Sequence, residues 1–403
     1  MSAATVSRAD LAQKARAFPV ASFRMVGLSA TAIGLVLLLI SLRGHAARVW
    51  QAYHFNFIFW LGLAQASVVV AATQKLAKGR WSGLVIRLAE ASVAFLPVAV
   101  VLFFVSFFGR TYIYPWIAEP REDLGWWLKP TWFYLRDGAV LALLAWLSWR
   151  FVRRDVAPDV TELAGGQPVE PTEAERSLLA RDAALVAVGF AFGLSLIAFD
   201  TVMSLAHKWV SNLYGAFYFM GSFLTALMWL AVLSIRMRQR MELEEVYSRK
   251  QQHDLAKLCF GFTVFWAYLM FAQFLVIWYG NLPEETYFVF YRLWGPWRPL
   301  GIAVFLMVFL IPFIALLGEK PKKSPGWLLA IALVSLAGVW LERYLEIVPS
   351  INGGAGPAIG VPELGALLFF AGLYALSYSW FAGRYPMISP RLAADTLERE
   401  HSH

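Results

Sequence analysis

Several stretches of this chain are long enough to cross a lipid bilayer and carry almost no charge. Residues 25–42, for example, contain no charged side chain. A helix crosses the hydrocarbon core of a membrane with roughly 20 apolar residues, and no soluble fold needs so many such runs. Because lipid offers the backbone no hydrogen-bond partners, each run is expected to form an α-helix. The pattern predicts an all-α integral membrane protein.

The same criterion, applied along all 403 residues, predicts about ten transmembrane helices. Only 15% of the residues are charged, whereas soluble domains carry about 25%. The deficit is concentrated in the predicted helices rather than spread evenly. The expected spans are residues 25–42, 53–74, 84–107, 132–151, 183–203, 210–235, 255–279, 300–317, 327–345 and 362–381.

Lysine and arginine are distributed unequally between the two sets of loops that these helices define. The set that includes both termini holds 24 of them, and the other set holds eight. Because cytoplasmic loops accumulate these residues, we expect a multi-pass protein of the bacterial cytoplasmic (inner) membrane with both termini in the cytoplasm. The same bias accounts for the net charge of +8, so the lipid bilayer, and no nucleic acid, is the expected partner.

The longest connection between predicted helices follows the fourth one. Its residues include several Pro, Gly and Glu, a composition that favours a flexible segment. We therefore expect five regions along the chain. These are a cytoplasmic tail at 1–24, helices one to four within 25–152, a cytoplasmic linker at 153–182, helices five to ten within 183–381, and a second cytoplasmic tail at 382–403.

Charged side chains inside the predicted helices are functional candidates, because a charge in a bilayer costs several kcal/mol unless it is paired or hydrated. Arg87 and Glu90 lie three residues apart on one helix face, which suits either a structural ion pair or a proton relay. Asp137 follows Arg136 at the start of the fourth helix, where an interfacial pair is the simpler interpretation. Arg87, Glu90 and Asp137 are assigned to a candidate proton path.

Three further residues near the end opposite the termini complete this candidate proton path. Glu342 and Arg343 are adjacent near the end of the ninth helix, and Glu363 opens the tenth. A negative charge at a helix N-terminus is favoured by the helix dipole. Capping therefore explains Glu363 as well as proton transfer does.

A group of polar residues lies between the fifth and sixth helices. Asp200 is near the end of the fifth helix, and Ser204, His207 and Trp209 follow it in a short turn. An acid, an imidazole, a hydroxyl and an aromatic ring at one membrane edge suit a quinol headgroup, whose two hydroxyls need proton acceptors. The alternative is a polar turn that satisfies its own helix ends. These four residues are the candidate quinone or proton site.

Metal ions and covalently bound cofactors are not expected in this chain. Cys259 is its one cysteine, which leaves no ligand set for an iron–sulfur cluster and no CxxCH attachment for haem. None of the six histidines lies deep in a predicted helix, so a pair of haem ligands at matching depth is not expected either.

Two blocks of sequence carry a resemblance to a known family. They are FDTVMSLAHKWVSNLYGAFYFMGSF at 199–223 and HDLAKLCFGFTVFWAYLMFAQFLVIWYGNLPEET at 253–286. Both resemble the F subunit of bacterial alternative complex III, a quinol:cytochrome c oxidoreductase. That subunit is described as quinone-binding membrane subunit 2 and is related to the NrfD-like, polysulfide-reductase-type membrane anchors. The expected helix count and orientation agree over nearly the whole chain.

The resemblance implies two four-helix bundles, formed by helices two to five and six to nine, with the first and tenth helices peripheral. It also implies protein partners: a sister ten-helix quinol-oxidising membrane subunit, a periplasmic iron–sulfur subunit, c-type cytochrome subunits and, as a further candidate, a terminal oxidase. Haem and iron–sulfur clusters would belong to those partners. A quinone or menaquinone is the ligand that the resemblance implies for this chain.

One difference from the sister subunit bears on the expected role. The sister subunit has a Trp-His pair in the turn after its fifth helix, whereas here Trp209 is followed by Val210 and His207 precedes it. We therefore expect an accessory membrane subunit that contributes a proton path and a quinone pocket. The alternatives are a structural anchor of the complex and a stand-alone secondary transporter. The sequence lacks the paired Gly/Pro-interrupted helices that mark many transporter sites.

Overall fold

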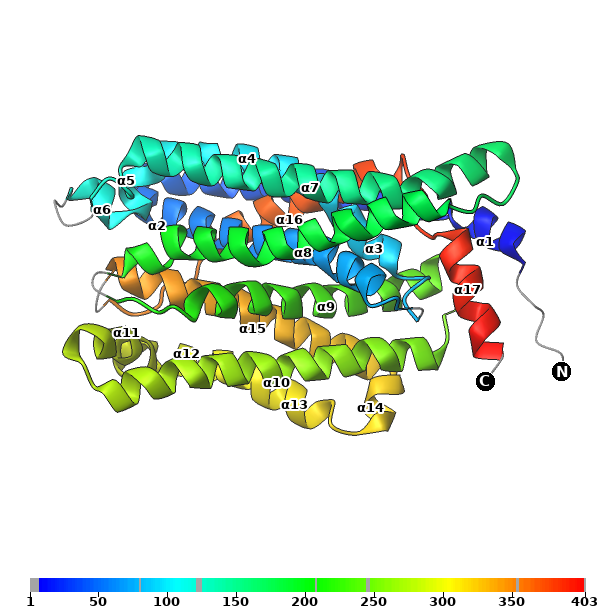
Figure 1. Ribbon diagram of the computed structural model, residues 1–403. Helices are drawn as coiled ribbons and strands as arrows, with labels where there is room; N and C mark the ends of the chain where they lie inside the picture. The colour runs from blue at the N-terminus through cyan, green and yellow to red at the C-terminus, as the bar shows by residue number, and fades with distance from the viewer. Residues whose placement is uncertain are drawn as a thin grey trace.

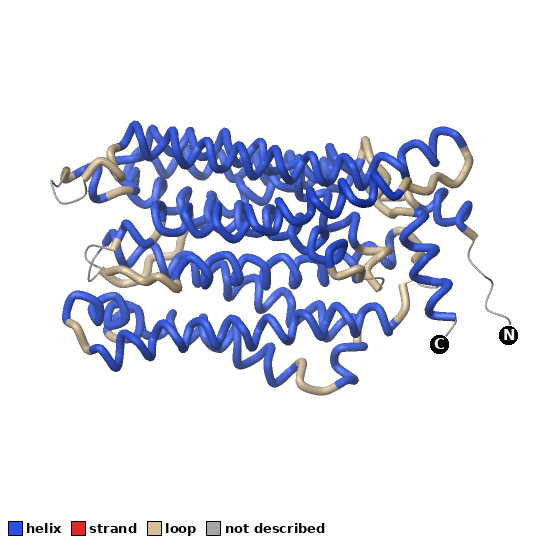
Figure 2. The backbone as a smooth tube through the Cα atoms, in the orientation of Figure 1, coloured by secondary structure: helices blue, strands red, loops and turns tan. Residues whose placement is uncertain are grey.

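The computed structural model describes residues 7–79, 81–120, 125–206, 209–243, 247–352 and 355–401. Within these ranges the chain forms helices and loops and has no β-strand (Figure 2). The predicted all-α class is confirmed. Eight helical stretches are long and apolar enough to cross a membrane, as a multi-pass membrane protein requires: Val20–Leu76, Ile86–Ile113, Glu173–Leu205, Tyr214–Arg240, Arg249–Gly280, Gly295–Ala315, Pro325–Asn352 and Val361–Ala382.

The helices run mostly parallel or antiparallel to one long axis (Figure 1). The α-helices are α1 (Arg8–Lys14), α2 (Val20–Leu76), α3 (Ile86–Glu90), α4 (Leu96–Val105), α5 (Arg110–Ile113), α6 (Pro115–Ala118), α7 (Pro130–Gly165), α8 (Glu173–Thr201), α9 (Tyr214–Arg240), α10 (Arg249–Gly280), α11 (Pro283–Leu293), α12 (Arg298–Phe305), α13 (Ile311–Ala315), α14 (Glu319–Lys323), α15 (Pro325–Asn352), α16 (Val361–Ala382) and α17 (Pro390–His401). Short 3-10 turns are η1 (Ala91–Phe95), η2 (Ser106–Gly109), η4 (Met203–Leu205) and η5 (Gly295–Trp297), and η6 (Leu306–Leu310) is a π-helical turn.

The first half of α2 packs closely against α16. A Cβ atom at Gly27 would lie 2.9 Å from Leu376 Cγ, and one at Gly34 would overlap the backbone of Phe369. As the residue number rises in α2, the number of its partner in α16 falls, so these two segments are antiparallel. Small residues at such crossings allow helix backbones to approach closely in membranes.

The second half of α2 runs in the opposite direction from the first. The backbone leaves the helical conformation at His45, with φ −138° and ψ 42°. Beyond that point the rings of Tyr53 and Phe370 are 5.0 Å apart, and those of Trp60 and Tyr374 are 5.1 Å apart. Here both residue numbers rise together, so this half is parallel to α16. Thus α2 is a hairpin, as the two predicted spans at 25–42 and 53–74 require.

The helix α7 is longer than the sequence led us to expect. It was predicted to end at residue 151 and to be followed by a flexible linker at 153–182, but it continues to Gly165 and ends where Gly166 adopts a left-handed φ of 70°. Thr172 then caps α8, so only residues 166–172 are non-helical between the two. The extra turns are held by buried ion pairs of Asp155 and Asp159, which the local composition did not reveal.

The helices gather in two groups that share an interface. The second half of α2 lies with α3, α4, α7 and α8, whereas α9 lies with α10, α15 and the α12–α13 segment. The helices α2 and α8 both contact α9, which joins the groups. The helix α16 touches both, because Tyr374 hydrogen-bonds to Ser92 at 2.7 Å and accepts from Trp229 Nε1 at 2.9 Å.

Both ends of the described chain lie at the same end of the molecule (Figure 1). We call this the N/C end and the opposite one, where α5, α6 and α11 lie, the distal end. The predicted C-terminal tail at 382–403 contains a docked helix, because α17 rests against Gly83 and contacts α1. The backbone N–H of Met387 also donates to the carbonyl oxygen of Ala15 at 3.1 Å.

Candidate functional site

A cavity of about 390 Å³ lies at the distal end, between α9, α10, α11, α12 and α15. This volume falls in the range of small-molecule sites, which are mainly apolar with a few polar groups. We call it the distal cavity. Most of its wall is aromatic or aliphatic, including Phe217, Met270, Phe274, Ile302 and Phe305.

The outer wall of the distal cavity is formed by α11, a short helix between α10 and α12. Asn281, in the left-handed conformation with φ 47°, ends α10 and lets the chain turn into α11. Phe288 and Arg292 line the cavity from α11. The ring of Phe288 stacks on Trp209 with centroids 3.6 Å apart and planes 3° from parallel. This stack joins α11 to the loop before α9.

Two acids of α15, Glu342 and Glu346, line the cavity, and Arg343 of the same helix lies behind them. Trp266 Nε1 donates to Glu342 Oε1 at 2.8 Å, and Arg343 Nη1 binds Glu346 Oε2 at 2.7 Å. Arg343 Nη1 is also 3.8 Å from Glu342 Oε2. Gly221 lacks the side chain that would crowd Arg343, since a Cβ there would be 3.0 Å from Nη2. Glu342 is thereby held at the cavity wall.

Arg292 enters the same cavity from α11 without an acid as its direct partner among the described residues. Its Nη1 donates to the carbonyl oxygen of Phe288 at 2.8 Å, and its Nη2 donates to Ser350 Oγ at 2.7 Å and to the carbonyl oxygen of Glu346 at 2.6 Å. The guanidinium carbon lies 3.4 Å from the centre of the Phe288 ring. These contacts tie α11 to α15 and place a positive charge beside an apolar space.

A second polar group, the distal cluster, lies between α7 and α8. Arg136 Nε donates to Asp137 Oδ1 at 2.9 Å, and Arg136 Nη2 binds Asp200 Oδ2. Trp127 Nε1 donates to Asp200 Oδ1 at 3.0 Å, and Ser204 Oγ donates to the carbonyl oxygen of Asp200 at 2.6 Å. Asp137 and Asp200, which are distant in sequence, are therefore joined through one guanidinium.

The distal cluster has two carboxylates for one guanidinium. Both acids are buried, and Asp137 Oδ2 has no hydrogen-bond partner among the described residues. A hollow of about 270 Å³ reaches Asp200 and Ser204 and is also lined by Trp127 and Asn212. Buried like charges without compensation are unfavourable, so this arrangement suits a site that exchanges a proton with its surroundings.

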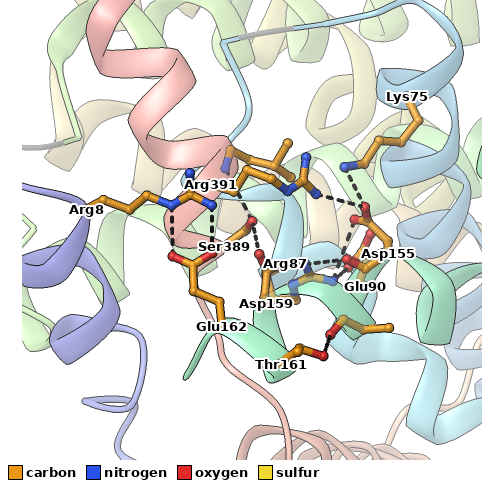
Figure 3. Close-up of polar contacts among 12 residues, drawn as sticks. Arg8, Lys75, Arg87, Glu90, Asp155, Asp159, Thr161, Glu162, Ser389 and Arg391 are labelled. Carbon is orange, nitrogen blue, oxygen red and sulfur yellow. Dashed lines mark hydrogen bonds and ion pairs between the residues drawn. The ribbon is translucent and has the colours of Figure 1, made fainter. Parts of the chain in front are cut away.

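A third group, the N/C cluster, lies at the other end of the same helix group, and Figure 3 shows its polar contacts. Arg87 Nη1 binds Glu90 Oε2, and Arg87 Nη2 binds Asp159 Oδ2 at 2.5 Å. Lys75 Nζ is 2.8 Å from Asp155 Oδ1, and Arg87 Nη1 is 3.6 Å from Asp155 Oδ2. Arg87, Glu90, Asp155 and Asp159 are completely or almost completely buried.

The C-terminal segment covers the N/C cluster. Ser389 Oγ donates to Asp159 Oδ1 at 2.9 Å, and Arg391 Nη2 is 3.8 Å from Asp155 Oδ1. Figure 3 shows Ser389 and Arg391 reaching the acids of α7 beside Arg87. With Lys75 included, three basic side chains face three acidic ones, which satisfies the requirement that buried charges be paired.

The structure divides the predicted quinone or proton site into two places. Asp200 and Ser204 belong to the distal cluster, whereas Trp209 lies on the wall of the distal cavity. His207 lies outside the described residues. Glu342 lines the cavity and Arg343 contacts it from behind the wall. Arg87 and Glu90 are in the N/C cluster. The remaining two candidates are Asp137, in the distal cluster, and Glu363, which binds Arg48 at 2.7 Å and accepts from Gly360 N at 2.8 Å.

Several residues at these sites were missed by the sequence analysis. Asp155 and Asp159 are four residues apart, which places them on one face of a helix. The Pro and Gly residues that follow them instead favoured a flexible linker. Trp266 has the appearance of an ordinary apolar-helix residue. Arg292 falls in a predicted loop, and nothing in the local sequence indicates that it is buried.

Comparisons with known proteins do not identify a family for this chain. No family model matches the sequence, and no curated protein matches it significantly. The resemblance to the membrane subunit of alternative complex III therefore stays a prediction. The geometry of the cavity and the two clusters provides the independent argument.

Proposed function

We propose that this chain is an accessory membrane subunit of a bacterial respiratory quinol:cytochrome c oxidoreductase of the alternative complex III type. In this role it holds a quinone or menaquinone in the distal cavity and carries protons through its buried carboxylates. Electrons pass through haem and iron–sulfur groups on partner subunits. The proposed partners are the sister quinol-oxidising membrane subunit, the periplasmic iron–sulfur subunit, the c-type cytochromes and a terminal oxidase.

The distal cavity is the observation that carries this proposal. It combines an apolar interior with Glu342, Arg292 and Gln273 on its wall. A quinone headgroup is a flat ring with two oxygens, and its isoprenoid tail is apolar, so the ligand needs this combination of surfaces. The resemblance in 199–223 and 253–286 supports the same ligand, because both blocks supply residues to the cavity, among them Trp209 and Trp266.

The two charge clusters support the proton-conducting part of the proposal. The distal cluster and the N/C cluster lie at opposite ends of one helix group. Between them, Gln65 Nε2 donates to Ser148 Oγ at 2.8 Å in a buried contact. Acids inside a membrane are rare unless they take part in transport or proton relay. In this proposal Asp137 and Asp200 exchange protons at one side of the membrane, and Glu90 does so at the other.

The proposal includes ten crossings and a fixed orientation. The eight apolar stretches supply nine of these crossings, because the hairpin α2 crosses twice. The tenth is α7, which is not among the eight stretches. Charged residues of α7, such as Arg136 and Arg150, limit its longest uncharged run to residues 138–149. At 36 residues this helix is roughly 54 Å long, enough to cross a bilayer. We place the N/C end in the cytoplasm of the bacterial inner membrane, because most lysines and arginines lie there.

Purification of the tagged chain from its native membrane in mild detergent tests the proposed assembly. We expect it to elute with c-type cytochromes, identified by haem absorbance and by mass spectrometry, and with an iron–sulfur protein. A secondary transporter, the alternative from another class, would elute without haem proteins. Elution of the chain without any of them from membranes that contain the intact respiratory chain would contradict the proposal.

The structural-anchor alternative is tested on the same purified complex. If the chain conducts protons, Asp200→Asn and Asp137→Asn should slow quinol-driven proton release in proteoliposomes by about tenfold or more, as loss of a proton-transfer group does. The matched control is Asp254→Asn, a change at a carboxylate bound to Lys257 near the surface. Unchanged proton release in both cluster variants would leave an anchor as the better description.

A further inference from the structure

Four buried polar atoms on the wall of the distal cavity have no hydrogen-bond partner among the described residues. They are Glu342 Oε2, Arg292 Nε, Trp209 Nε1 and Tyr214 Oη. The four side chains are 3%, 6%, 2% and 1% exposed, respectively. Buried polar atoms are almost always paired in native proteins. Glu342 Oε2 has only the longer contact of 3.8 Å with Arg343 Nη1. Four buried atoms without a hydrogen bond around a single cavity therefore indicate positions where a ligand makes hydrogen bonds.

These atoms differ in what they require from a ligand. As a carboxylate, Glu342 can only accept at Oε2, and its other oxygen, Oε1, already accepts from Trp266 Nε1 at 2.8 Å. Arg292 Nε and Trp209 Nε1 can only donate, whereas the Tyr214 hydroxyl can donate or accept. The acceptor is on α15, whereas the donors are on α11 and on the loop before α9. A matching ligand presents a hydroxyl hydrogen to α15 and an oxygen lone pair to the donors.

We infer that the distal cavity recognises the reduced form of a lipid-soluble quinone, with one quinol hydroxyl donating to Glu342 and the second oxygen accepting from Arg292 or Trp209. This inference rests on the proposed function, since it refines the ligand of the same cavity. An oxidised quinone has two carbonyl oxygens and no hydrogen to donate, so it would place an oxygen lone pair against the ionised carboxylate of Glu342. Binding breaks no bond, and both electrons stay on the ligand.

The exposed part of the cavity wall accounts for the apolar tail of such a ligand. Leu293 and Ile302 line the cavity and are 37% and 47% exposed. The cavity therefore reaches the outer surface of the helix bundle between α11 and α12. In a membrane that surface faces lipid, so a chain of isoprene units can leave the cavity there while the ring stays beside Glu342.

A redox titration of the bound ligand tests the inference. The full-length chain is purified into lipid nanodiscs and loaded with a naphthoquinone that bears four isoprene units. Tighter binding of the reduced form raises the midpoint potential of the bound couple above that in empty nanodiscs. We expect at least about tenfold preference for the quinol, because the oxidised form leaves a buried acceptor unpaired. For a two-electron couple this equals a rise of about 30 mV.

Two variants identify the residues responsible. Glu342→Gln replaces the carboxylate with an amide that can donate as well as accept a hydrogen bond. The preference for quinol over quinone should therefore fall to about threefold or less. Arg292→Gln should weaken the binding of quinol and of quinone by a similar factor, because each of them has an oxygen at that position. The preference for quinol should therefore be preserved. The matched controls are Glu284→Gln and Arg298→Gln, which change exposed side chains of the same region that do not line the cavity.

The outcomes separate this inference from the proposed function. If the unmodified chain binds quinone and quinol equally well, or if Glu342→Gln retains the full preference, the inference is wrong although the quinone site stands. If neither form binds, the quinone pocket itself is refuted. The measurement on the unmodified chain decides the main point even if a variant fails to fold, which a thermal melt of each preparation will reveal.

Discussion

Arg87 shows how a few buried charges depend on one another. Its guanidinium contacts Glu90 and Asp159 and is 3.6 Å from Asp155. None of these side chains has appreciable contact with solvent. Transferring such groups from water is unfavourable, and only their mutual pairing offsets the loss of hydration. A single missing partner therefore leaves an excess charge that the surroundings cannot stabilise.

Replacing Arg87 should destabilise the protein strongly. We expect Arg87→Gln to lower the free energy of unfolding by about 3–5 kcal/mol, the usual effect of breaking a buried ion pair from one side. Thermal melting in detergent measures the loss, and Arg176→Gln is the control because Arg176 is 64% exposed. Adding Glu90→Gln to the first variant should restore part of the stability. A double variant less stable than Arg87→Gln would contradict the pairing.

The candidate residues could be recognised from the sequence only as individual charges in apolar surroundings. Arg87, Glu90 and Glu342 can be found in this way, because their apolar surroundings are visible in the local sequence. The sharing of Arg136 by Asp137 and Asp200 cannot, since it depends on how α7 packs against α8. Asp200 and Trp209 are close in sequence, whereas in the structure they belong to the distal cluster and to the wall of the distal cavity, respectively.

At the scale of secondary-structure elements, the pairing of α2 with α16 depends on glycine. Gly34 approaches the backbone of Phe369 so closely that a methyl group cannot be accommodated. In contrast, a Cβ at Gly44, in the same long helix, would meet no atom within 4 Å. The contact is between backbones, so no side-chain rotation can relieve it.

These two glycines provide a matched pair of substitutions. Gly34→Ala should force the first half of α2 away from α16 and lower the melting temperature by several degrees, as overpacking of about 1–3 kcal/mol does. Gly44→Ala should leave the melting temperature the same or raise it slightly, because alanine favours helix more than glycine. Equal melting temperatures for the two variants would mean that α2 and α16 do not pack as described.

The elements themselves were predicted with different success. Nine of the ten expected spans lie wholly or mostly in the eight apolar stretches, because length and lack of charge are local properties, whereas the number of crossings stays a prediction. The kink at His45 had been expected only as a loop between two helices. The composition after residue 152 predicted flexibility, although Asp155 and Asp159 bind Arg87 and extend α7. Long-range ion pairs of this kind decide where a helix ends, and they leave only weak local signals.

On the scale of the whole molecule, the charges on the two ends differ in a way that bears on orientation. The N/C end carries most of the lysines and arginines, including those of α14 and the start of α10. The distal end carries the cavity, the distal cluster and α11. If the N/C end is cytoplasmic, quinol bound in the cavity lies near the periplasmic side, where the proposed haem and iron–sulfur partners would collect its electrons.

Cysteine labelling in spheroplasts tests this orientation directly. The one natural cysteine, Cys259, is completely buried, so the unmodified chain should react little with a membrane-impermeant maleimide. Glu284→Cys puts a thiol at the distal end, and Glu173→Cys puts one at the N/C end, both at exposed positions. We expect the first to be labelled in intact spheroplasts and the second only after the membrane is permeabilised, because the thiols lie on opposite sides. The reverse labelling pattern would mean that the protein has the opposite orientation, with the cavity on the cytoplasmic side. Labelling of both in intact spheroplasts would rule out the proposed arrangement of crossings.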